Sequence, residues 1–193
     1  DAGNYDLFAV DDAYADITVR SVKASFTVDG TRTYDGTRVA GIVNSSISQA
    51  GDSGVPSDEG VISGEDVTLD DAGAVALFGD KNVGTAKRVD LYGASLVGPD
   101  ALNYELVTEP TADGDSQAFT TADITAKSLT GSFDAATKTY DGTTGATVTD
   151  RSLTDVVTVG SVTDDVSLTG GTAAFDTDRK STRLNSSHLV ISY

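Results

Sequence analysis

Hydrophobic and polar residues alternate along most of this chain with a period of two, the spacing of a half-buried β-strand. Residues 25–28 and 31–34 flank Asp29-Gly30, a pair that favours a tight turn, and they are predicted to form a β-hairpin. Further strands are predicted at residues 61–62, 66–69, 75–78, 87–92, 104–107 and 119–125, with a turn at 81–84 and a short helical turn within 97–102. The pattern predicts a mostly β fold with little helix.

One stretch of the chain occurs twice. Residues 24–37 (ASFTVDGTRTYDGT) return as residues 131–143 (GSFDAATKTYDGT), so that Tyr140 lies 106 positions after Tyr34. Ala-Asp-Ile-Thr at 15–18 returns at 122–125, and Asn4-Tyr5 returns as Asn103-Tyr104. We therefore expect tandem domains: 1–18 the end of a preceding repeat, 19–125 a complete repeat, and 126–177 the first half of the next. Tandem domains of one kind usually build length or valency rather than one active site.

The last residues, 178–193, do not continue the repeat. Residues 178–188 read DRKSTRLNSSH, which resembles a common sequencing adapter translated in one frame. We expect this tail to be non-native and to take no part in the fold. The single histidine, His188, lies within it.

Charge and composition narrow the possible partners. The formal net charge is −17, and 26 of the 30 acidic residues are Asp, which favours turns over helix interiors. Such a surface repels nucleic acid and anionic lipid, so neither is expected as a partner, and no apolar run is long enough for membrane insertion. The chain has no cysteine, which excludes disulfides, thiolate metal sites and a cysteine nucleophile.

The motifs together resemble a known family. Tyr-Asp-Gly-Thr after a strand, Gly-Glu-Asp-Val or Asp-Asp-Val before an apolar strand, Lys-Asn-Val-Gly-Thr, and Asp-Ala-Gly-Asn-Tyr followed by Ala-Asp-Ile-Thr are similar to the YDG-type repeats of large bacterial surface adhesins and filamentous-haemagglutinin-like exported proteins. The resemblance covers residues 1–177. It implies tandem β-grasp-like domains, for which an Ig-like β-sandwich is the alternative, in an extracellular or bacterial cell-surface protein.

The resemblance implies a function as well as a fold. It implies a structural spacer that projects or stiffens a stalk, contacts neighbouring repeats and contributes weak multivalent adhesion to an unknown extracellular ligand; no catalytic residue and no cofactor come with it. The alternative is a glycan- or protein-binding module that acts through loops between strands. Two insertions, at 49–60 and 109–117, are expected to be surface loops, and neither contains an aromatic residue, which favours the spacer.

The recurring tyrosine motifs are expected to be structural. In Tyr34-Asp35-Gly36 and Tyr140-Asp141-Gly142, the ring should close one edge of the core while Asp-Gly turns the chain. Asn4-Tyr5 and Asn103-Tyr104 are expected to act in the same way, with Asn bridging backbone groups in a turn.

Calcium is the one cofactor that the sequence suggests as a candidate. Paired carboxylates could supply oxygen ligands at repeat junctions, although none matches an EF-hand loop, and solvated loop charge is the simpler explanation. The candidates are Asp11, Asp12, Asp16, Glu65, Asp66, Asp70, Asp71, Asp113, Asp115, Asp164 and Asp165. Without His188, no Ser-His-Asp or zinc constellation can be assembled, so we do not expect an enzyme.

Overall fold

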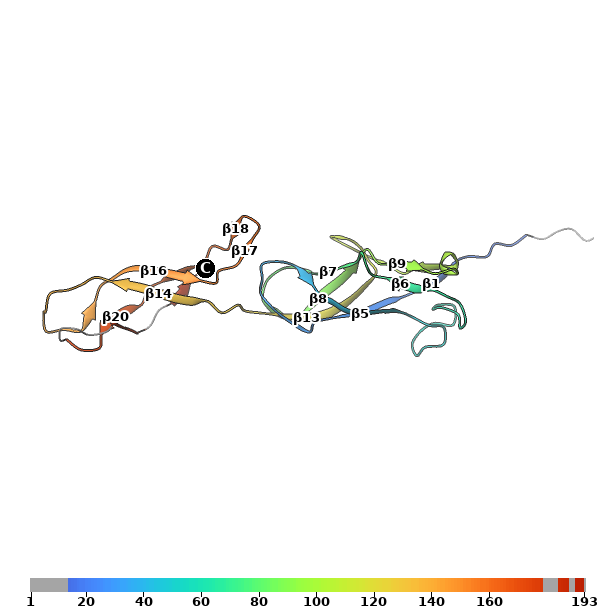
Figure 1. Ribbon diagram of the computed structural model, residues 1–193. Helices are drawn as coiled ribbons and strands as arrows, with labels where there is room; N and C mark the ends of the chain where they lie inside the picture. The colour runs from blue at the N-terminus through green and yellow to red at the C-terminus, as the bar shows by residue number, and fades with distance from the viewer. Residues whose placement is uncertain (1–13, 179–183, 188–189, 193) are drawn as a thin grey trace, which may run out of the picture. The chain divides into compact units, whose positions relative to one another are not determined.

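The computed structural model describes residues 14–178, 184–187 and 190–192 (Figure 1). Strands dominate, and the one helical element in this part of the chain is a 3-10 turn, η2 (Ala101–Asn103), which confirms the expected mostly β fold with little helix. The described residues form two compact units. Unit 1 comprises 14–27, Ile42–Ala76 and Asp90–Phe119; unit 2 comprises Val28–Gly41, Leu77–Val89 and the described residues from Thr120 onward.

Unit 1 is built from short strand pairs. β1 (Arg20–Val22) runs parallel to β10 (Tyr104–Leu106), β2 (Ala24–Val28) pairs with β5 (Ile42–Ile47), and β6 (Thr68–Asp70) runs antiparallel to β9 (Ser95–Val97). A small hairpin joins β11 (Glu109–Thr111) to β12 (Gly114–Ser116). The core of unit 1 holds Val22, Val61, Val67 and Tyr104, with Ile47, Leu96, Ala101 and Leu106 packed against them.

The largest sheet has five strands, and most of its residues belong to unit 2. Its order is β3 (Thr31–Thr33), β13 (Ala118–Thr125), β8 (Gly84–Tyr92), β7 (Val75–Phe78) and β4 (Val39–Ala40). β3 runs parallel to β13, with Thr31 opposite Asp123. Phe78, Val89 and Ile124 are fully buried, so this sheet carries the principal apolar core of unit 2.

The second copy of the repeated sequence uses the same strand pairs as the first. β14 (Thr130–Ala135) runs antiparallel to β16 (Val148–Thr154), as β2 pairs with β5. A pair of serine hydroxyls bridges the strands in each case: Ser25 to Ser46 at 2.8 Å and Ser132 to Ser152 at 2.6 Å. β15 (Gly145–Ala146) lies beside β20 (Thr172–Phe175) as β4 lies beside β7. Equivalent sequence therefore takes equivalent local structure, while the repeat boundaries stay a prediction.

The tail enters the fold, which corrects one expectation. β21 (Leu184–Ser187) runs antiparallel to β20, and β22 (Val190–Ser192) runs antiparallel to β19 (Ser167–Thr169). An unpaired strand edge presents N–H and C=O groups that can pair with almost any extended backbone, whatever its sequence. Because such pairing does not depend on the origin of the segment, the adapter origin of residues 178–193 stays a prediction.

The predicted hairpin across Asp29-Gly30 is wrong. Its two arms correspond to β2 and β3, but β2 pairs with β5 and β3 pairs with β13, so the arms are not partners. Gly30 does not take a positive φ angle. Of the turn predicted at 81–84, residues 81–83 lie between β7 and β8, and Gly84 is the first residue of β8. Residues 61–62 form no strand, and Val61 makes an isolated bridge to Gln49. No helix within the described residues has the length and apolar character to cross a membrane.

Candidate functional site

The first Tyr-Asp-Gly-Thr segment folds into a closed turn after β3. Asp35 Oδ1 accepts hydrogen bonds from the Thr37 N–H and the Thr37 hydroxyl, both at 2.8 Å. Gly36, between them, has φ +82°, a conformation that side chains disfavour. Burial alone would raise the pKa of Asp35, but the Thr37 hydrogen bonds and the charge of Arg32 outweigh it and lower that pKa. The expectation that Asp-Gly turns the chain is confirmed here.

A cation two residues before the tyrosine fastens this turn. Arg32 Nη1 donates to Asp35 Oδ2, Thr37 Oγ1 and Val39 O, and Arg32 Nη2 donates to Thr37 O, over 2.7–3.0 Å. The guanidinium also lies over the ring of Phe78, 5.1 Å from its centroid. Arg32 thereby ties the turn both to the strand that follows and to the core of the sheet.

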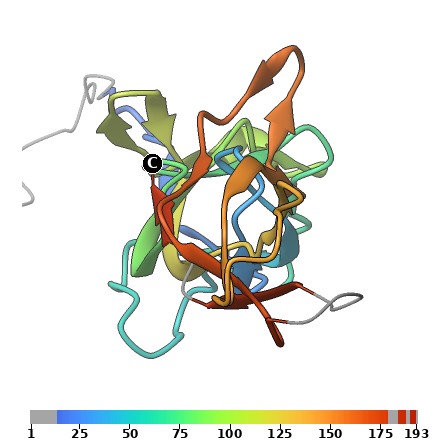
Figure 2. The same cartoon turned by 90° about the vertical axis from the view of Figure 1, so that its left-hand side faces the viewer.

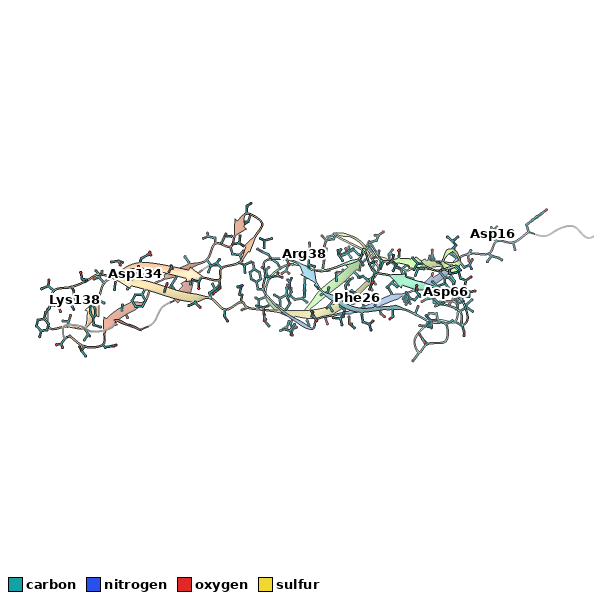
Figure 3. The ribbon with its side chains drawn as sticks, in the orientation of Figure 1. Asp16, Phe26, Arg38, Asp66, Asp134 and Lys138 are labelled. Atoms are coloured by element: carbon teal, nitrogen blue, oxygen red, sulfur yellow. The ribbon has the colours of Figure 1, made fainter. Side chains whose placement is uncertain are left out.

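The second copy repeats the arrangement with a lysine. Lys138, labelled in Figure 3, donates from Nζ to Thr143 O, Thr143 Oγ1 and Gly145 O at 2.8–3.0 Å, and pairs with Asp141 at 2.8 Å. Asp141 Oδ1 again accepts from the N–H and hydroxyl of Thr143, and Gly142 has φ +73°. The Lys138 hydrogen bond and those from Thr143 lower the pKa of Asp141 to about 2.

The two tyrosines of these turns have different surroundings. Tyr34 is half-buried, and its hydroxyl donates to Asp164 Oδ2 at 2.8 Å. Tyr140 is 73% exposed. The expectation that the ring closes an edge of the core is therefore wrong for Tyr140, because the turn places its ring in solvent.

Tyr104, in contrast, is part of a core. It is 7% exposed and packs with Val22, Val61 and Val67. Its hydroxyl donates to the Glu65 carboxylate and accepts from the Ile62 N–H at 3.0 Å. Burial, and then the hydrogen bond to Glu65, raise the pKa of Tyr104.

Acidic residues at matching places in the two copies each accept from a tyrosine hydroxyl. Glu65 precedes Asp66-Val67 and binds Tyr104; Asp164 precedes Asp165-Val166 and binds Tyr34. Asn103 belongs to η2, where its N–H donates to Asp100 O, and Asn4 and Tyr5 lie outside the described residues.

The calcium candidates are scattered along the described chain. Several of them have partners within the chain: Asp70 Oδ1 accepts from the Ala72 N–H, Asp71 Oδ2 accepts from the Ser45 hydroxyl, and Asp164 forms an ion pair with Lys81. The Asp66 N–H donates to Asp100, while Asp16 and Asp115 are exposed. Among the described residues, no three His, Cys, Asp or Glu side chains cluster as metal ligands would. Asp11 and Asp12 lie outside the described part.

The sequence reasoning missed the cation of the turn. Arg32 and Lys138 hold the same place in Arg-Thr-Tyr-Asp-Gly-Thr and Lys-Thr-Tyr-Asp-Gly-Thr, so the signal was present as a basic residue at a fixed distance before Tyr-Asp. It also missed the pairing of Tyr34 with Asp164, which no local spacing indicates, because the two residues lie 130 positions apart.

These features define an acidic, strand-rich protein in which a cation-fastened Tyr-Asp-Gly-Thr turn is built twice. The family model described as YDG domain matches residues 18–114, which is half of the chain, and the chain belongs to that family. No curated protein and no solved structure matches the chain.

Proposed function

We propose that this chain is a non-catalytic spacer segment of a bacterial cell-surface or secreted adhesin, in which YDG domains follow one another and hold the rest of the protein at a distance. The observation that carries the proposal is the repetition of one turn, with its own fastening cation, on equivalent strand pairs in both copies. A single active site does not require a repeated local framework, whereas a spacer gains length with every copy.

The surface of the chain supports the same role. The net charge of −17 favours the solubility of a long exported array and opposes association between separate molecules. The loop at residues 49–60 consists mostly of small and acidic residues, with Gln49, Val55 and Pro56 and no aromatic residue. Such a loop is poorly suited to a binding hot spot, which disfavours the binding-module alternative.

The proposal is tested by pulling the full chain from its two ends in an optical trap. A spacer made of self-contained β-domains should resist and then release length in discrete steps. At about 3.5 Å per residue, a domain of about 100 residues should add about 350 Å. Smooth extension without a force peak would contradict the proposal. So would saturable glycan or protein binding by the full chain that disappears when residues 51–58 are replaced by a short Gly-Ser linker.

A further inference from the structure

The two Tyr-Asp-Gly turns have the same internal structure but different neighbours. A Cβ added to Gly36 would lie 2.6 Å from Val159 Cγ2 and 2.8 Å from Val157 Cγ1, whereas a Cβ added to Gly142 would meet nothing within 4 Å. Gly36 and these valines all belong to unit 2. The first turn therefore has another segment of the chain pressed against its glycine, and the second turn has open space.

The segment that meets Gly36 is a small hairpin of the second copy. It is made of β17 (Thr158–Val159) and β18 (Val162–Thr163), and the Asp164 N–H closes it by donating to Val157 O at 2.9 Å. Figure 2 shows β17 and β18 projecting from the other strands of their own copy. Val162 is 70% exposed and Val159 is 43% exposed, so neither side chain is buried in a core.

Polar contacts complete the meeting of the turn and the hairpin. Asp164 Oδ2 accepts from the Tyr34 hydroxyl at 2.8 Å, and Asp164 Oδ1 accepts from Lys81 Nζ at 3.3 Å. Lys81 also lies over the Tyr34 ring, 5.7 Å from the centroid. Both carboxylate oxygens of Asp164 are thus used by residues of the first copy.

We propose that the Tyr-Asp-Gly turn is a docking face for the following repeat: its glycine admits the Val157 and Val159 side chains, and its tyrosine and Lys81 hold the acidic residue at the end of the hairpin. The exposed Tyr140 and the open space at Gly142 present the same face, and its occupant is the corresponding valine-and-acid hairpin of a further repeat. In the proposed spacer, this contact would be the joint between successive repeats. The contact itself does not depend on the proposed function, but its role as a joint does.

The test uses the full chain and the second turn as a built-in control. Tyr34→Phe removes the hydroxyl that binds Asp164, and Gly36→Ala fills the space that the valine side chains occupy. Tyr140→Phe and Gly142→Ala make the same chemical changes at the turn on which no hairpin docks. Both alanine variants carry the same strain, because φ is +82° at Gly36 and +73° at Gly142. Asp164→Asn is a third variant, which leaves the backbone of both copies unstrained. The readout is ¹⁵N NMR relaxation, with the methyl shifts of Val157 and Val159 as a local probe.

In the parent chain and in the control variants Tyr140→Phe and Gly142→Ala, we expect the segment 20–125 and the segment 130–175 to have the same rotational correlation time. In Tyr34→Phe, Gly36→Ala and Asp164→Asn the smaller segment should tumble with a clearly shorter time, and the valine methyl resonances should shift. Two separate correlation times in the parent chain, or equal effects at the two turns, would overturn the docking face. The stepwise extension that tests the spacer does not depend on this contact, so the two proposals can fail separately.

Discussion

Replacing Arg32 by methionine tests whether the cation holds the turn. The change keeps an unbranched apolar stem over Phe78 but removes four hydrogen bonds, to Asp35, to Val39 O and to two oxygens of Thr37. A hydrogen bond to a charged group contributes about 1.5–3 kcal/mol when its partner is left buried, and less when water can replace it. The side chain is 17% exposed, so water reaches part of the site.

Two further effects adjust this magnitude. The cation–π contact with Phe78 adds about 0.5–1 kcal/mol to the loss. In the other direction, Arg32 Nε is buried with no hydrogen-bond partner in the described part of the chain, and methionine relieves that penalty. We therefore expect Arg32→Met to lower the free energy of unfolding by about 2–4 kcal/mol.

The second copy supplies the matched control. Lys138 makes the equivalent contacts with one ammonium group, so Arg32→Lys should keep the ion pair with Asp35 and most carbonyl contacts and lose only the guanidinium stacking. We therefore expect Arg32→Lys to lower the free energy of unfolding by about 1 kcal/mol.

The assay is urea unfolding of the full chain followed by tyrosine fluorescence, combined with hydrogen exchange at the Thr37 amide, which Asp35 holds. If methionine and lysine at position 32 give equal losses, the charge does not fasten the turn and the reasoning is refuted.

Three other predictions follow from single contacts. Gly98→Ala should lower the free energy of unfolding in urea by at least about 3 kcal/mol, because φ is +124° and the added Cβ would lie 2.1 Å from Asp66 O. The control Gly51→Ala has φ +92° but open space around the added Cβ, so it should lower the free energy of unfolding by only about 1 kcal/mol. The Asp141 carboxyl should titrate near pH 2 by ¹³C NMR, so that its contribution to stability is complete above pH 3.8 and lost as the pH falls through 2; a midpoint at 3.8 would contradict the fastening by Lys138. Deleting residues 178–193 should speed hydrogen exchange at the amides of β20 and leave exchange in β8 unchanged, because β20 loses its partner β21; unaltered protection in β20 would show that this pairing is absent in solution.

The sequence predicted which segments are strands better than it predicted which strands pair. Alternation of apolar and polar residues is a local property, and it located β2, β7, β8 and β13. Pairing depends on which apolar faces meet in the folded chain. β3 therefore pairs with β13, some ninety positions later, although Asp29-Gly30 favoured a local hairpin.

Loop composition was also a limited guide. Residues 109–117 are polar and were expected to be a surface loop, and within them β11 and β12 form a paired hairpin with Gly114 at φ +124°. The Thr111 hydroxyl donates to Gly114 O at 2.8 Å and stabilises the short turn. Polar composition predicted exposure correctly for most of this hairpin but did not predict its backbone pairing.

The candidate site was predictable where it is local and unpredictable where it is not. The turn formed by the Asp, Gly and Thr of the motif is held by hydrogen bonds between residues near one another in the sequence. Both copies have the same hydrogen bonds and a positive φ at the glycine, so the repeated sequence was sufficient to infer a turn. The tyrosine side chain has different surroundings in the two copies: the Tyr34 ring lies under Lys81 and its hydroxyl binds the Asp164 carboxylate of the other copy, while Tyr140 is exposed to solvent. A residue that recurs without serving the local structure is best explained by a partner outside it. The tyrosine is therefore the part of the motif that most directly supports a docking face, and the aspartate and glycine are the part that builds the turn on which it is presented.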